Sequence, residues 1–182
     1  MNMPGSALMV IDAAHYSAVE WLPNARRLEI RAFKSEDRAD FLSAVDRIGP
    51  SSLYRRFFTV KRHFTEREHA FFLNVDFDKH VALVALIEEA GQKVVVGGGR
   101  YVVVQPAKAE IAFTVIDQYQ GQGIGTILMR HLSAIARAAG LHELIAEILP
   151  ENMPMLKVCE RSGLHMSTTR ESEITHVVLH LN

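Results

Sequence analysis

The stretch Gln120-Gly121-Gln122-Gly123-Ile124-Gly125-Thr126 decides the fold. It follows an apolar run at residues 111–116 and opens a segment, to about residue 139, in which apolar residues recur at helical spacing. A strand that ends in a glycine-rich turn and continues as a helix directs backbone N–H groups and the positive end of the helix dipole at one point. Glycine also lets an anion approach the backbone closely. The stretch therefore predicts a binding site for a phosphate or diphosphate group.

The composition is that of an ordinary globular domain. The chain has 182 residues, of which 48% are hydrophobic and 23% charged, enough for one domain with a full core. The net charge of −1 gives no field that would recruit nucleic acid or an anionic membrane. No apolar stretch approaches the ~20 residues of a membrane helix, and residues 1–5 lack the features of a signal peptide. We therefore expect a cytoplasmic protein with no nucleic-acid or membrane partner.

Cysteine and histidine usage argues against disulfides and metals. The one cysteine, Cys159, excludes an internal disulfide and suits a reducing compartment. The nine histidines are scattered without the spacing of a ligand set, so no metal site is expected. The sequence leaves the oligomeric state open.

The order of periodic segments predicts an α/β fold. Residues 1–26 form an N-terminal accessory segment with a short helix around 13–21, and residues 27–182 form the main domain. The glycine-rich turn connects two strands through a helix, which predicts parallel pairing of those strands, whereas flanking hairpins predict antiparallel pairing. The result is a mixed, mostly antiparallel sheet of about seven strands with helices on both faces. The expected strands are 28–33, 81–87, 93–104, 110–117, 144–149, 164–169 and 173–181, and three glycines at 97–99 indicate a bulge or a close backbone approach.

Three interpretations of the glycine-rich turn compete on spacing alone. A Walker loop requires a lysine after the glycines, but Thr126 and Ile127 follow Gly125. A dinucleotide fingerprint requires a third glycine where Thr126 stands. The turn could also be a purely structural connection between strand and helix.

The segment Gln120-x-x-Gly123-x-Gly125 resembles the (Arg/Gln)-x-x-Gly-x-(Gly/Ala) motif of the GNAT superfamily of N-acetyltransferases. The resemblance covers about residues 28–181 and is sharpest at 110–164. Residues 51–58 (Ser-Ser-Leu-Tyr-Arg-Arg-Phe-Phe) and Gly99-Arg100-Tyr101 look like the bacterial protein-lysine acetyltransferase (Pat-type) branch.

This resemblance implies acetyl-CoA as the acetyl donor and a sheet splayed between its fourth and fifth strands. The donor's diphosphate would lie on Gln120, Gly121, Gln122, Gly123, Ile124, Gly125 and Thr126. Its pantetheine arm would contact backbone groups of Thr114, Val115 and Ile116. Asn152 resembles the family's asparagine near the pantetheine, and local sequence also makes it a helix N-cap.

Glu110 is the candidate general base. Acetyl transfer to an amine requires that the ammonium lose a proton, and the resemblance implies Glu110 because it opens the strand that holds the donor. Partial burial near Ile111 and Phe113 would raise the pKa of its carboxyl towards neutrality. The alternative is an ordinary carboxylate in water.

Cys159 stands where many members of the family place a tyrosine as general acid. Its thiol could accept the acetyl group first, in a ping-pong route, or it could be a small buried residue. A basic cluster of Arg55, Arg56, Lys61 and Arg62 could contact a phosphate of CoA or an acidic acceptor, or form a solvated face.

The expected function is acetyl-CoA-dependent N-acetylation of a primary amine by direct attack in a ternary complex, with a protein lysine as the preferred acceptor. One alternative is the same chemistry on a small amine. Another is a non-catalytic module that binds acyl-CoA and regulates a partner.

Overall fold

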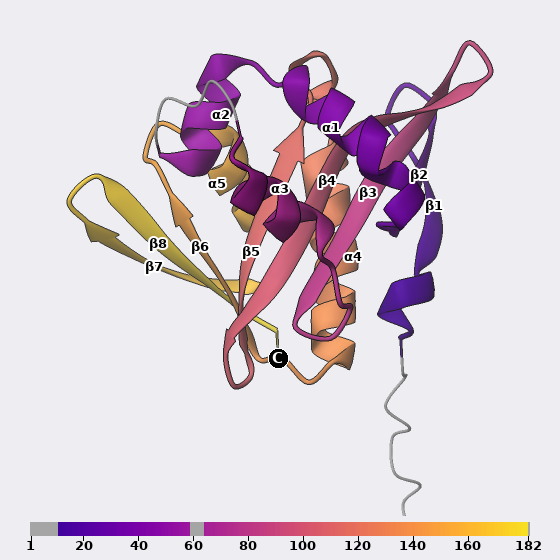
Figure 1. The fold of residues 1–182 in the computed structure, drawn as a ribbon. Helices are drawn as coiled ribbons and strands as arrows, with labels where there is room; N and C mark the ends of the chain where they lie inside the picture. The colour runs from indigo at the N-terminus through magenta and orange to yellow at the C-terminus, as the bar shows by residue number, and fades with distance from the viewer. Residues whose placement is uncertain (1–10, 59–63, 182) are drawn as a thin grey trace, which may run out of the picture.

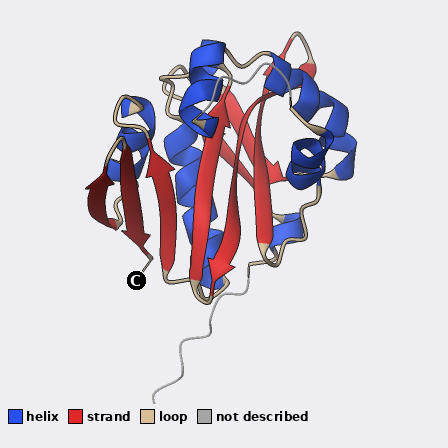
Figure 2. Ribbon diagram, turned by 60° about the vertical axis from the view of Figure 1, so that its left-hand side comes forward, coloured by secondary structure: helices blue, strands red, loops and turns tan. Residues whose placement is uncertain are grey.

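The centre of the molecule is one eight-stranded sheet with the strand order β1-β2-β3-β4-β5-β6-β8-β7. The computed structural model describes residues 11–58 and 64–181. Neighbouring strands are antiparallel except β5 and β6, which are parallel. Helices cover both faces of the sheet (Figures 1 and 2). The expected fold class is confirmed, with eight strands where about seven were expected.

The sheet contains the seven expected strands and one more, β1. The strands are β1 Ser17–Trp21, β2 Arg27–Ala32, β3 His80–Glu89, β4 Gln92–Gln105, β5 Lys108–Val115, β6 Glu143–Ile148, β7 His165–Glu171 and β8 Ile174–His180. The α-helices are α1 Arg38–Asp46, α2 Pro50–Phe57, α3 Glu66–Leu73, α4 Ile124–Ala138 and α5 Met153–Glu160. Short 3-10 turns η1 Ala13–His15, η2 Ser35–Asp37 and η3 Asp117–Tyr119 connect them.

The prediction of a helix around residues 13–21 is wrong. Residues 17–21 form the edge strand β1, which pairs with β2, and only η1 is helical. The boundary expected between residues 26 and 27 lies where the β1–β2 hairpin enters β2. Residues 17–21 are therefore part of the sheet, while a division into an accessory segment and a main domain stays a prediction.

The middle of the sheet is buried on both faces. Every residue of β3 from His80 to Ile87 is buried, because α1 and α3 cover one face and α4 the other (Figure 1). On β4, the register shifts between the pairs Ala85–Gly97 and Leu86–Val95, so the expected bulge is present. A Cβ atom at Gly99 would lie 2.6 Å from Cδ1 of Phe113, which confirms the close approach.

Strands β5 and β6 part soon after they meet. They pair only at Lys108–Glu143, Ala109–Leu144 and Glu110–Ile145, whereas β5 continues to Val115 and β6 to Ile148. Figure 1 shows the two strands diverging beyond this point. The sheet is therefore splayed between the strands that were expected to be the fourth and fifth.

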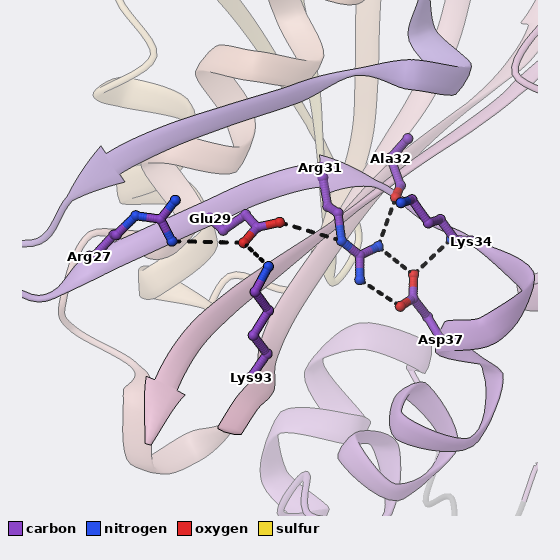
Figure 3. Close-up of polar contacts among 7 residues, drawn as sticks. All are labelled: Arg27, Glu29, Arg31, Ala32, Lys34, Asp37 and Lys93. Carbon is purple, nitrogen blue, oxygen red and sulfur yellow. Dashed lines mark hydrogen bonds and ion pairs between the residues drawn. The ribbon is translucent and has the colours of Figure 1, made fainter. Parts of the chain in front are cut away.

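A polar network fixes the start of the helical layer (Figure 3). Arg31 of β2 donates two hydrogen bonds to Asp37, Nη1 to Oδ2 at 2.6 Å and Nη2 to Oδ1 at 2.7 Å. The backbone N–H of Lys34 donates to the same carboxylate at 2.8 Å. Burial alone would raise the pKa of Asp37, but the hydrogen bonds from Arg31 and Lys34 outweigh it and hold that pKa below its ordinary value.

Candidate active site

The turn before α4 presents a row of free backbone donors. Gly121 and Gly123 have φ angles of 75° and 90°, a backbone conformation that favours glycine. Within the described residues, the backbone N–H groups from Gly121 to Thr126 have no hydrogen-bond acceptor, and the first bond into the helix is Ile127 N–H to Gly123 O at 3.0 Å. Six consecutive unpaired amides at a helix N-terminus fit a diphosphate group.

The side chain of Gln120 braces this turn. Its Nε2 lies 3.0 Å from the carbonyl oxygen of Val115, 3.2 Å from Oγ of Ser52 and 3.2 Å from Oδ1 of Asp117. These partners belong to β5, α2 and η3. Gln120 therefore positions the loop, and its side-chain amide is directed at protein acceptors.

The turn borders a cleft with a volume of about 540 Å³. The cleft runs from α2 over the end of β5 to β6 and α5, where the two strands have parted. Ten of the expected site residues line it: Glu110, Thr114, Val115, Gln120, Gly121, Gly123, Ile124, Gly125, Thr126 and Asn152. The structure thus brings together residues that are up to 42 positions apart in the sequence.

Two expected donor-binding residues are not in the cleft lining. Ile116 is buried, its N–H donates to the carbonyl of Val96 at 2.9 Å, and it lines a second, smaller cavity. The side chain of Gln122 turns back, and its Nε2 donates to the carbonyl of Gln118 at 3.4 Å. The Oε1 of Gln122 is buried and has no partner among the described residues, so we expect its backbone N–H to be the group that contacts a ligand.

Asn152 acts as the N-cap of α5. Its Oδ1 accepts a hydrogen bond from the N–H of Met155 at 3.3 Å. The side chain is half-buried at the cleft wall, so the capping role and a place beside the ligand coexist.

Glu110 lies at the point where β5 and β6 separate. It is exposed and lines the cleft, so the expectation of a partly buried carboxyl is wrong. The physical reason is the parting of the strands, because β6 no longer covers β5 beyond Glu110. The negative charge of Glu110 attracts the guanidinium of Arg56, which lines the same cleft.

Cys159 lies on the inner face of α5, away from the cleft. Its side chain is completely buried, and burial raises the pKa of its thiol to about 11. Both observations favour the alternative in which Cys159 is a packing residue. Among the described residues of the lining, Tyr119 is the one phenol, and its hydroxyl donates to Oε1 of Glu89 at 3.0 Å.

The lining also includes basic residues to which sequence reasoning assigned no definite role. Arg55 and Arg56 of α2 line the cleft, whereas Lys61 and Arg62 lie outside the described residues. Lys157 of α5 and Arg161, the C-cap of that helix, were not anticipated. Their spacing of four on a helix after Asn152 was the available signal, because i and i+4 side chains share a face.

The described residues contain neither a cluster of metal-binding side chains nor a membrane-spanning helix. In residues 11–58 and 64–181, no group of three or more His, Cys, Asp or Glu side chains could hold a metal ion. No helix in the same part of the chain is long and apolar enough to span a membrane.

Comparison with known proteins identifies a family and several relatives of this chain. The model of the Acetyltransferase (GNAT) family matches residues 50–164. Acetyltransferase PA5475 of Pseudomonas aeruginosa is 30% identical over 155 residues, 85% of this chain and 82% of that protein. Acetyltransferase Pat of Mycolicibacterium smegmatis is 36% identical over 114 residues, which are 62% of this chain and only 33% of that protein.

Solved structures agree with these matches. The GNAT domain of S. lividans PAT superposes with a TM-score of 0.81 at 25% identity, over 90% of this chain and 96% of that one. The yncA protein of Salmonella typhimurium, solved with its cofactor acetyl-CoA, has a TM-score of 0.68 at 20% identity, over 85% of this chain and 94% of that one. The latter similarity concerns the fold alone.

Proposed function

Because the chain belongs to the acetyltransferase (GNAT) family, a family of N-acetyltransferases that use acetyl-CoA, we propose that it acetylates protein lysine side chains by direct attack in a ternary complex. The observation that carries the proposal is the cleft itself. It joins a row of free backbone amides to a carboxylate at the point where two parallel strands part.

The donor would bind along the open edge of β5. The amides from Gly121 to Thr126 would hold its diphosphate, and the backbone at Thr114 and Val115 would hold the pantetheine arm. Acetyl-CoA supplies an activated acetyl group and a thiolate that leaves as the new bond forms. The carbonyl of Val115 already accepts from Gln120, so the arm would use other backbone groups of this strand.

Glu110 would remove the proton from the acceptor's ammonium group. Its exposed position gives an incoming amine direct access, and a positioned carboxylate can act as a general base. The burial of Cys159 favours direct attack by the amine over transfer through a thiol. With the hydroxyl of Tyr119 donated to Glu89, solvent would supply the proton to the leaving thiolate.

The lysine acceptor rests on similarity to the Pat-type branch. Both the match to Pat of M. smegmatis and the superposition on the GNAT domain of S. lividans PAT support this branch. The chain spans about a third of the mycobacterial protein, so only the acetyltransferase part is compared. A single free cysteine, Cys159, agrees with a cytoplasmic site of action.

The proposal is tested by thiol release from acetyl-CoA. Lysine-containing peptides and free amines are offered as acceptors, and mass spectrometry identifies the acetylated atom. We expect the lysine Nζ of peptides to be acetylated with a higher kcat/KM than free amines. Faster acetylation of free amines would replace the lysine acceptor by a small one. Saturable binding of acetyl-CoA in calorimetry without turnover on any amine would point to a regulatory acyl-CoA-binding module.

A further inference from the structure

A second cavity of about 60 Å³ lies behind the cleft, between β3–β5 and the helices α1–α3. Its walls are mainly apolar, with aromatic rings from Phe41, Phe57 and Phe72. Arg56, Ala112 and Thr114 line both this cavity and the cleft. The two spaces are therefore neighbours that share one wall.

Two guanidinium groups line this apolar cavity. Arg100 projects from β4, and its Nη1 donates to the carbonyl of Phe72 at 3.2 Å and to Nε2 of His80 at 2.9 Å. Its guanidinium carbon also lies 4.9 Å from the ring centre of Phe72. Arg56 lies over the ring of Phe57, at 5.1 Å. Aromatic faces thus lie against both cations, and neutral acceptors bind Arg100.

The described lining of the cavity contains no carboxylate. Neither guanidinium has an ion pair within 4.0 Å among the described residues, although Glu110 attracts Arg56 from farther away. The two cations also repel each other: burial and then the charge of Arg56 lower the pKa of Arg100 to about 9. Charges without counter-ions in an apolar space are costly, and an anion placed between them would remove that cost.

We propose that this cavity is an anion-binding subsite for the acceptor, in which Arg56 and Arg100 hold a carboxylate group while the acceptor's amine faces Glu110. Arg56 links the two spaces because it lines both. A carboxylate suits the small volume and the planar guanidinium groups, which can donate paired hydrogen bonds to it. The carboxylate can belong to a free amino acid or to an acidic residue beside a target lysine. The acceptor role rests on the proposed function, whereas anion binding can be measured without any reaction.

Anion binding is tested on the wild-type protein with formate as the probe. The Nε–Hε signals of the arginines are followed by ¹⁵N NMR, and Arg56→Lys and Arg100→Lys variants assign the two signals. We expect saturable shifts for Arg56 and Arg100, no such shifts for the exposed Arg38 and Arg170, and no effect of formamide. Shifts that rise linearly with formate, with the same slope at all four arginines, would overturn the subsite.

The acceptor role is tested by matched pairs of amines. 4-Aminobutyrate and 6-aminohexanoate are compared with their amides, and peptides with glutamate beside the lysine are compared with peptides carrying glutamine. We expect a kcat/KM at least about tenfold higher for the carboxylates, because hydrogen bonds between charged groups are the stronger kind. In Arg100→Met the ratio of carboxylate to amide should fall to about one. A preference among the small amines would identify a free amino acid as the source of the carboxylate, and a preference among the peptides would identify an acidic residue beside the lysine.

The formate titration and the amine pairs distinguish a failure of the anion subsite from a failure of the proposed function. Transfer to amines without any preference for a carboxylate would overturn the acceptor subsite and leave the acetyltransferase proposal in place. Saturable binding of formate without transfer to any amine would overturn the proposed function and support the anion site. Because the NMR titration uses the wild-type protein, a folding defect in Arg100→Met cannot decide the result.

Discussion

At the scale of single residues, the cleft combines two exposed carboxylates, Glu110 and Glu147, with backbone amides. Glu110 remains accessible because the strand that would cover it departs at the next residue. Its exposed position leaves the carboxylate open to the amine of a bound acceptor, so proximity to that amine would account for its contribution.

Glu110→Gln is expected to lower kcat by about 10²–10⁴-fold, the typical contribution of a general base. Acetyl-CoA should still bind, because the amides of the loop are unchanged. Steady-state kinetics and calorimetry measure the two effects separately. Glu173→Gln, the same change in the exposed turn between β7 and β8, is the control. A variant of Glu110 that keeps near-wild-type kcat across the pH range would rule out the base.

Gly123→Ala is expected to weaken acetyl-CoA binding as well as stability. Gly123 has a φ of 90° and Gly140 a φ of 79°, and a Cβ atom at either would meet nothing within 4 Å. Alanine at each position should therefore cost a similar ~1 kcal/mol of backbone strain. Only at Gly123 would the added methyl group stand between the diphosphate and the amides. Equal affinities of Gly123→Ala and Gly140→Ala for acetyl-CoA in calorimetry would contradict the assigned loop.

At the scale of elements, local signals in the sequence specified helix ends and hairpins well. Asn152 caps α5, as expected. Thr65 and Glu68 form a capping box of the type T-x-x-E at the start of α3, with Glu68 N–H to Thr65 Oγ1 at 3.2 Å, and Gly140 follows α4 with a positive φ. Such features depend on a few neighbouring residues, which is why one sequence is enough to predict them.

Strand β1 shows where local signals fail. Its five residues alternate between exposed and half-buried, and two of the exposed ones are Val19 and Trp21. The segment forms a strand because β2 offers a free edge for pairing. A link to α4 adds to this: the Tyr16 hydroxyl contacts Nδ1 of His131 at 2.5 Å. Such distant partners cannot be read from local periodicity.

The Arg31–Asp37 pair joins β2 to the first helical turn, and its loss should destabilise the whole helical layer. The side chains are 15% and 8% exposed. Asp37→Asn would leave the largely buried guanidinium with only the carboxylate of Glu29, 3.7 Å from its Nε, at a cost of about 3 kcal/mol. Folding lowers the pKa of Asp37. The carboxylate therefore contributes to the free energy of unfolding above its ordinary pKa, and this contribution is lost as the pH falls through its pKa in the folded state. The difference between wild type and variant in urea unfolding should therefore shrink below pH ~4. Asp46→Asn, the same change at an exposed position of α1, should show neither effect.

At the scale of the whole molecule, the sequence predicted the cleft better than its surroundings. The turn, β5 and Asn152 were identified because each carries a motif within a few residues. The second cavity was not predicted, since it exists only where α1–α3 pack on β4 and bring Arg56 close to Arg100. For the same reason, the exposure of Glu110 depends on a strand that begins 33 residues later.

Two buried histidines should make the stability of the whole molecule depend on pH. His80 accepts from Arg100 at Nε2, so its Nδ1–H donates to the carbonyl of Asn74 at 3.1 Å, and the ring is neutral. His131 lies between the hydroxyl of Tyr16 and Oε1 of Glu20, the latter 2.9 Å from its Nε2. Burial lowers the pKa of both rings below the ordinary value of 6.5, and Arg100 lowers that of His80 further, although Glu20 opposes the effect at His131.

The sign of the pH dependence follows from the lowered pKa values. Between the folded and the unfolded pKa of each ring, the unfolded chain binds more protons, so the free energy of unfolding falls as the pH drops below about 6.5. The loss of stability is complete below the pKa of each ring in the folded state. Above pH 7.5 neither ring makes the free energy of unfolding depend on pH. Urea unfolding at pH 7.5 and 5.5 should therefore show a lower midpoint at pH 5.5. The decrease should be smaller in His131→Gln, which removes one of the two rings, and unchanged in His142→Gln, whose ring is exposed. An equal decrease in all three proteins would mean that other groups cause the pH dependence.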